Sequence, residues 1–254
     1  MLDRMSPRRF VLALILLGCS LQAQALRWRV CLPDSSIPPL IYSEPGHDGL
    51  IERLLVDAGR QVGLEVELQH APPGRCLALL EGGSAEAALA PPTERNRKAV
   101  QFPMHGTQLD AGKYLFHIRF LLIGRRGWQQ TSWNGKSFGS TPLQSLSVGT
   151  RRNFSAVIEF LGAQGVRVDA GAATQQQVLE MLVQRRFDLA ALMDHELRRE
   201  PELPTGLVVL EPPLLSTAIF AVTGPQAWAE HSTRIEAWWN AIARLRDQPA
   251  YRAE

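Results

Sequence analysis

The stretch CLALLEGGSAEAAL, residues 76–89, has a counterpart in VLEMLVQRRFDLAA, residues 178–191. Matching residues stand at one constant offset of 102 positions: Leu77 with Leu179, Leu80 with Leu182, Glu86 with Asp188, and Ala88 with Ala190. Similarity at a fixed spacing indicates that one structural unit occurs twice in a chain. We therefore expect two similar α/β lobes instead of one large domain.

Each copy of this repeat reads as a strand, a helix and a second strand. A short alternating strand at residues 65–69 or 167–170 is followed by an amphipathic helix and then by a short apolar strand after an acidic residue. Strand, helix and strand in one sheet form a βαβ unit. A further strand and helix precede each copy, and Gly63 and Gly165 are natural stops for those helices. The pattern predicts an α/β fold with two Rossmann-like lobes.

Two apolar extended segments, residues 112–127 and 214–224, are expected to cross between the lobes and to act as a hinge. The last helix, residues 227–246, then returns to pack on the first lobe, with three residues on its buried face: Trp238, Trp239 and Ile242. We assign the lobes as follows: residues 26–118 with 219–254 form lobe 1, and residues 119–218 form lobe 2.

The first 25 residues have the pattern of a secretory signal peptide: arginines, an apolar run at residues 10–18, and small residues up to Ala25. We expect cleavage before Leu26 and a periplasmic mature chain. The apolar run is too short to remain as a transmembrane helix. An alternative is that LLGC, which ends at Cys19, acts as a lipobox, so that a lipid on this cysteine holds the protein at a membrane surface.

Charge and motif content exclude several function classes. The formal net charge is +2, and residues 1–25 hold three arginines and one aspartate, so the mature chain is neutral. A neutral chain gives no electrostatic reason to bind nucleic acid or an anionic membrane. The six histidines are scattered, and the chain has no phosphate-binding loop or strained nucleophile motif. We expect no metal, no cofactor and no enzymatic activity.

Two cysteines, Cys31 and Cys76, remain after cleavage of the signal. In an oxidising exported compartment such a pair is expected to form a disulfide that joins the first strand to a helix start. The alternative is two buried thiols, because sequence alone does not bring their Cα atoms within bonding range.

Besides the export signal, five motifs follow one another along the chain: PPLIY after the first strand, GLIERLL at the first helix, PTERNRKAVQFP, LSVGTRRNFS, and RRFDLAALMDHEL. In their order and spacing these motifs resemble the extracytoplasmic solute-binding proteins of family 3, the polar amino-acid binders with a type II periplasmic-binding-protein fold. The similarity covers residues 26–246. The resemblance implies two lobes joined by two crossover strands.

Members of this family close their lobes around a small ligand and commonly deliver it to an ABC importer. The resemblance therefore implies an exported solute-binding protein for a zwitterion such as an amino acid, with an ABC permease as partner; we expect a monomer. Some relatives are instead sensory partners of membrane signalling proteins. A few proteins with this fold are dehydratases, which need an acid in the cleft; Glu44 and Glu196 are the candidates here.

The family binds the ligand carboxylate with an arginine three residues after a threonine. Here Thr93 is a good N-cap, but Asn96 holds the arginine position and is flanked by Arg95 and Arg97. A guanidinium beside a helix N-terminus attracts a carboxylate. We predict that Arg95 contacts the ligand, with Arg97 as second candidate, and that Thr93 also lies at the ligand site. The alternative is a solvated basic helix face.

Further ligand contacts follow from the same resemblance. Asp194 matches the family carboxylate that receives the ligand ammonium group, although an aspartate there could also cap the next helix. The loop at the start of lobe 2 supplies three predicted lining residues: Arg152, Asn153 and Ser155, of which Ser155 could cap the following helix. Two more are expected from the loop after the first strand: Asp34 and Tyr42. We interpret Glu52 as a solvated or hinge residue, and Asp188 as structural.

Overall fold

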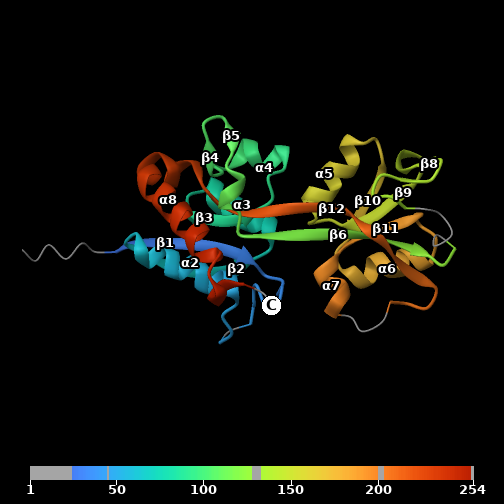
Figure 1. The fold of residues 1–254 in the computed structure, drawn as a ribbon, viewed down its shortest axis with the longest axis horizontal. Helices are drawn as coiled ribbons and strands as arrows, with labels where there is room; N and C mark the ends of the chain where they lie inside the picture. Colours follow the sequence, from blue (N-terminus) through green and yellow to red (C-terminus); the bar gives the residue numbers. More distant parts are fainter. Residues whose placement is uncertain (1–24, 45, 128–132, 200–202, 253–254) are drawn as a thin grey trace, which may run out of the picture.

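The computed structural model describes residues 25–252 apart from residue 45, residues 128–132 and residues 200–202. The predicted signal peptide, except Ala25, and the predicted lipid site Cys19 lie outside the described residues. Figure 1 shows an elongated molecule in which the N-terminal and C-terminal parts of the chain share one half.

The first half is built on a three-stranded parallel arrangement with β1 in the centre. Its elements are β1 (Leu26–Pro33), α2 (Leu50–Gln61), β2 (Leu64–Ala71), α3 (Pro73–Glu81) and β3 (Ala87–Ala90). The predicted helix stop at Gly63 is confirmed, because this residue has a φ of +72°, which favours glycine.

The second half repeats the first. Its elements are β9 (Ser147–Arg151), α5 (Ser155–Ala163), β10 (Arg167–Ala172), α6 (Gln175–Val183) and β11 (Leu189–Met193). The strand order β10-β9-β11 is the equivalent of β2-β1-β3, and Gly165 has the same φ of +72° as Gly63. The two predicted α/β units are therefore present.

The acidic residues of the repeat have the same task in both halves. The Glu86 carboxylate accepts a hydrogen bond from the backbone N–H of Arg29 at 2.7 Å, which ties β3 to β1. The Asp188 carboxylate accepts from the backbone N–H of Ser147 at 2.8 Å and from its hydroxyl at 2.7 Å, which ties β11 to β9. The internal repeat thus extends from sequence to individual contacts.

Two long strands, β6 (Phe116–Arg125) and β12 (Leu207–Thr223), pair with each other along most of their length and cross between the halves (Figure 1). β6 also pairs with β11, and β12 also pairs with β3. The described strands of both halves therefore form one continuous eight-stranded sheet in the order β10-β9-β11-β6-β12-β3-β1-β2. The predicted boundaries between residues 118 and 119 and between 218 and 219 fall inside these strands, and we keep them as a proposed division into lobes.

β12 begins at Leu207, well before the predicted start of the second crossing at residue 214. Pro212 and Pro213 interrupt the apolar pattern of the sequence, and proline is unexpected within a ladder. The β6–β12 register shifts between Leu210 and Leu215, and this irregularity accommodates the prolines within one strand.

The last helix, α8 (Pro225–Arg246), packs against α2 of lobe 1, as predicted. Trp238, Trp239 and Ile242 are at most 1% exposed, and the Trp238 indole donates a hydrogen bond to the Leu55 carbonyl at 3.2 Å. Full burial of side chains of this size contributes about 1.5–3 kcal/mol each. This packing fixes the C-terminal end of the chain on lobe 1.

The remaining helices and strands are short: α4 (Glu94–Ala99), α7 (Asp194–Arg199), β4 (Met104–His105), β5 (Gln108–Leu109), β7 (Ser137–Phe138), β8 (Thr141–Pro142), η1 (Ala111–Lys113), η3 (Leu143–Ser145) and η4 (Pro249–Tyr251). Within the part of the chain that the structure describes, no helix is both long and apolar enough to span a bilayer.

Candidate functional site

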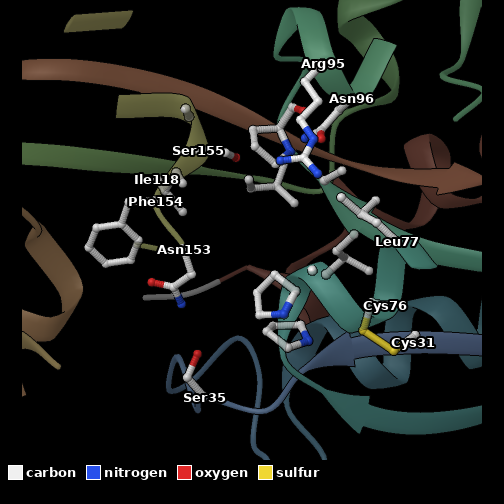
Figure 2. A pocket seen from close by; sticks show the side chains of 18 of the residues that line it. Cys31, Ser35, Cys76, Leu77, Arg95, Asn96, Ile118, Asn153, Phe154 and Ser155 are labelled. Carbon is white, nitrogen blue, oxygen red and sulfur yellow. A yellow bond between two sulfur atoms is a disulfide. The ribbon is translucent and has the colours of Figure 1, made fainter. Parts of the chain in front are cut away.

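A cavity of about 330 Å³ lies between the two lobes beside the crossing strands. Its walls come from the ends of β1 and β3, from α3 and α4, from the first half of β6, and from the loop between β9 and α5. Parallel α/β sheets bind ligands beyond the carboxyl ends of their strands, where these loops meet. Figure 2 shows side chains from both lobes facing one another across this space.

The start of α4 is held by two buried polar residues. The Thr93 hydroxyl caps the helix by accepting from the Asn96 N–H at 3.1 Å, as its sequence position predicts. The Asn96 amide in turn donates to the Pro91 carbonyl at 2.9 Å. Both side chains are at most 5% exposed. Asn96, which stands at the arginine position of the motif, therefore has a structural task and also lines the cavity, whereas Thr93, predicted at the ligand site, lies outside the linings of both described cavities.

The two arginines beside Asn96 have different positions. Arg95 lines the cavity, and its side chain extends from α4 toward the space opposite Asn153 and Ser155 (Figure 2). Among the described residues, no hydrogen bond or ion pair of the Arg95 guanidinium is found. Arg97 is exposed, lies outside the cavity lining, and donates from its Nε to the Pro92 carbonyl at 3.1 Å.

Lobe 2 contributes the loop at the start of α5, and all three residues predicted there line the cavity: Arg152, Asn153 and Ser155. Arg152 also donates to the Gly171 carbonyl at 3.1 Å, which connects it to β10. The suggested capping role of Ser155 is wrong, because Phe154 occupies the N-cap position and no side chain caps this helix. The Ser155 hydroxyl therefore forms no cap bond.

The Phe154 ring is buried, and the Arg151 guanidinium lies 5.0 Å from its centre. Arg151 also forms an ion pair with Glu196 of α7. These two contacts of Arg151 help to hold the lobe 2 loop in place, because a cation is attracted to the face of an aromatic ring.

Most of the remaining lining is apolar. The crossing strands contribute four side chains: Phe116, Ile118, Phe120 and Ile219. α3 contributes Leu77, and the disulfide between Cys31 and Cys76 lies at the base of the cavity (Figure 2). The predicted bond is thus present, with Cα atoms 5.3 Å apart. The sequence analysis missed these walls because an apolar residue that faces a cavity looks like one that faces a core.

Asp194 lies in a second, smaller cavity of about 210 Å³. This cavity shares Ile37, Ile118 and Met193 with the larger one, so the two are neighbouring parts of one cleft. The Asp194 carboxylate forms an ion pair with Arg119 of β6, whose Nε is 3.0 Å from the aspartate Oδ2. The predicted partner for a ligand ammonium group is therefore already bound to a cation of this chain.

Asp34 and Tyr42 lie outside the linings of both cavities. Asp34 is exposed, whereas its neighbour Ser35 lines the larger cavity. The Tyr42 ring packs against His47 with ring centres 5.8 Å apart. Sequence reasoning placed the correct loop at the cleft and selected other residues of that loop.

The interpretation of Glu52 as a solvated residue is wrong. Glu52 is 2% exposed, and its carboxylate accepts a hydrogen bond from the Tyr42 N–H at 2.8 Å, which ties the loop after β1 to α2. Burial raises the pKa of this carboxyl above its usual range, and the hydrogen bond from Tyr42 only partly offsets the rise. The helix pattern around Glu52 does not indicate this burial, because the segment that covers the side chain is the loop before α2 and not part of the helix.

One further contact joins the lobes at the edge of the cavity. Glu159 of α5 accepts a hydrogen bond at 2.6 Å from the backbone N–H of Glu94, the first residue of α4. Figure 1 shows these two helices facing each other above the crossing strands. A carboxylate is favourable at a helix N-terminus, so this bond helps to hold the lobes together next to Arg95.

No protein-family model matches this chain, and no curated protein matches it. Solved structures with the same architecture include the arginine-bound form of truncated ArgBP from T. maritima, with a TM-score of 0.58 and 16% identity over 86% of this chain and 96% of that one. They also include the substrate-binding protein of an amino acid ABC transporter, with a TM-score of 0.57 and 12% identity over 89% and 95%.

A histidine kinase sensor domain described as similar to periplasmic binding proteins also matches, with a TM-score of 0.61 and 15% identity over 89% of this chain and 93% of that one. At these identities the similarity concerns the fold, and it spans nearly the whole chain in each case. Together with the repeated βαβ units and the two crossing strands, it establishes that the chain has the type II periplasmic-binding-protein fold.

Proposed function

We propose that this chain is an exported, periplasmic solute-binding protein that closes its two lobes around a small amino-acid-like ligand and delivers it to an ABC importer. The observation that carries the proposal is the Arg95 guanidinium, which lines the interlobe cavity without a partner among the described residues and faces the loop of the opposite lobe. A cation kept in this way at a cavity is suited to grip a carboxylate through parallel hydrogen bonds.

The geometry divides recognition between the lobes. Arg95 of lobe 1 binds the ligand carboxylate, and the hydroxyl and backbone N–H groups near Ser155 approach the same group from lobe 2. The larger cavity has a volume near the lower end of the range of about 300–1,000 Å³ that is typical of small-molecule sites. Contacts from two lobes to one ligand favour the closed state, because only that state allows both.

Isothermal titration of the mature chain against a library of amino acids and small organic acids tests the proposal. We expect saturable binding of at least one compound without turnover. Loss of a charge-assisted hydrogen bond costs about 1.5–3 kcal/mol, so Arg95→Gln should weaken binding by roughly 10- to 150-fold. Arg97→Gln is the matched control on the same helix and should leave the affinity unchanged.

Failure of every compound to bind would overturn the proposed function. An equal loss of affinity in both arginine variants would refute the assignment of Arg95, because a nonspecific charge effect would then explain the result.

A second candidate is a periplasmic sensory partner that passes its open or closed state to a membrane signalling protein. The similarity to a histidine kinase sensor domain over 89% of the chain supports this alternative. The genes next to this one distinguish the two roles: a permease gene favours import, and a membrane cyclase or kinase gene favours signalling.

We further propose that the chain is not an enzyme. The two acids suggested for a dehydratase are poorly placed for that task, since Glu44 is exposed and Glu196 forms an ion pair with Arg151. Neither lines the described cavities. Incubation with prephenate or arogenate should give no product; measurable turnover would overturn this assignment.

A further inference from the structure

The charges around the larger cavity are unevenly distributed. The described lining contains two basic residues from opposite lobes: Arg95, whose side chain Figure 2 shows at the cavity, and Arg152, which also donates to the Gly171 carbonyl. Within the same described lining, Glu81 is the one acidic side chain, and it is exposed at the C-terminal end of α3. All three of these charged side chains are exposed, so a ligand that enters this cavity meets two positive charges and one carboxylate at its solvent-facing side.

The rest of the lining offers a hydrophobic surface to the body of a ligand. Nine apolar side chains with more than three heavy atoms contribute to it: Ile37, Leu77, Leu89, Phe116, Ile118, Phe120, Phe154, Met193 and Ile219. Burial of apolar area against such a surface contributes about 25 cal/mol per Å². The cavity thus suits a molecule with one anionic end and an apolar remainder.

The carboxylate expected to hold a ligand ammonium group is engaged elsewhere. Asp194 lies in the smaller cavity, on the other side of Ile118 and Met193, and is paired with Arg119. Its release would leave Arg119 without that partner, and breaking a partly buried ion pair costs free energy. An ammonium group in the larger cavity would in turn lose water and find an opposite charge in the described lining only at the exposed Glu81, where solvent weakens the attraction.

We infer that the larger cavity binds organic carboxylates with an apolar body and does not require an α-ammonium group. This inference rests on the proposed function and narrows its ligand class: a deaminated or N-acylated acid binds at least as tightly as the corresponding free amino acid. Arg95 fixes the carboxylate, and the apolar walls contact the remainder of the ligand.

A series of compounds with one side chain and different end groups tests the inference by isothermal titration of the mature chain. The aromatic series is 3-phenylpropanoate, N-acetylphenylalanine, phenylalanine and phenethylamine; an aliphatic series replaces these with 4-methylpentanoate, N-acetylleucine, leucine and isopentylamine. In at least one series we expect the deaminated acid to bind about tenfold or more tightly than the amino acid, and the amine not to bind. Tighter binding of the free amino acid in both series would overturn the inference.

Three variants locate the contacts. Arg95→Gln should weaken the acids by at least about tenfold, whereas Arg97→Gln, on the same helix but outside the cavity lining, should not. Glu81→Gln removes the one acidic side chain of the described lining and should leave acid binding at least as tight, because a like charge is lost; a selective loss of amino-acid binding in Glu81→Gln would identify Glu81 as an ammonium partner and refute the inference.

The two levels of the proposal fail in different ways. Binding of free amino acids together with clear rejection of their deaminated forms would refute this inference and leave the solute-binding function intact. Absence of binding by both series and by the wider library would refute the solute-binding function itself, and the inference with it.

Discussion

The disulfide between Cys31 and Cys76 should be a major contributor to the stability of lobe 1. The bond closes a loop with a sequence separation of 45 residues, which contains α2, β2 and the first turn of α3. In the chain-entropy model a crosslink over a loop of this length stabilises the native state by about 4 kcal/mol. The free energy of unfolding of a whole protein is about 5–15 kcal/mol, so the crosslink contributes a large fraction of it.

The comparison of oxidised and reduced wild-type protein measures this contribution with no change of side chain. Urea unfolding followed by tryptophan fluorescence reports on lobe 1, because Trp28 and Trp238 meet in its core with ring centres 6.0 Å apart. We expect reduction to lower the free energy of unfolding by about 4 kcal/mol and the melting temperature by about 8–16 °C. The variant C31S/C76S should fall at or below the reduced protein, since it also buries two hydroxyls.

A loss smaller than about 1 kcal/mol on reduction would refute the reasoning, because the unfolded chain would then gain little freedom from losing the crosslink. The position of the bond adds a functional readout. Both cysteines line the larger cavity, and α3 forms one wall of it. Reduction under native conditions should therefore weaken ligand binding, while the lobe 2 loop around Asn153 stays unaffected.

Three further predictions concern single residues. Folding raises the Glu52 pKa, so this residue contributes stability below its unfolded pKa of about 4.3 that is lost as pH rises through the folded value. Glu52→Gln should therefore be stabilised relative to wild type at pH 7 but not at pH 4, by urea unfolding at both values. Burial raises the Asp188 pKa, but the hydrogen bonds from the Ser147 hydroxyl and N–H, together with the charges of Arg125 and Arg167, give a net lowering of this pKa. Asp188→Ala should therefore lose about 1–3 kcal/mol at neutral pH and less as the pH falls through that pKa; equal losses at all pH values would contradict this. Glu159→Ala removes the hydrogen bond to the Glu94 N–H, so it should favour the open form, measured by small-angle scattering, and weaken ligand affinity by about 2- to 10-fold, measured by titration. Unchanged affinity would exclude a role of this hydrogen bond in lobe closure.

The fold was accessible from the sequence because its signals are local and repeated. Alternating strands, helices with leucines three apart, and glycines at helix ends each constrain a few neighbouring residues, and the constant offset of 102 residues reveals that the unit occurs twice. The second crossing strand shows where such signals end. Its first part contains Pro212, so only the pairing with β6 identifies it as strand.

The candidate site was only partly accessible, because it depends on contacts between distant segments. Asn96 illustrates the difficulty: it holds the motif's arginine position and lines the cavity, but its amide is used to hold the Pro91 carbonyl, and the charge at the cavity comes from the neighbouring Arg95. Asp194 is similar, since its partner Arg119 is 75 residues away and looks in the sequence like any polar position of a strand. A motif position therefore predicts which segment reaches the cleft more safely than which side chain does.

The ion pair between Arg119 and Asp194 also bears on the proposed ligand class. Arg119 lies in the crossing strand β6 at the proposed boundary of lobe 2, beside the pairing of Phe120 with Met193 that precedes Asp194. If a ligand ammonium group replaced Arg119, a hinge residue would lose its partner at the moment of closure, and part of the binding energy would be spent on that change. A ligand held by Arg95 and by apolar contacts avoids this cost. The arrangement of the two cavities thus favours an acid without an amine, for a reason that belongs to the hinge as much as to the pocket.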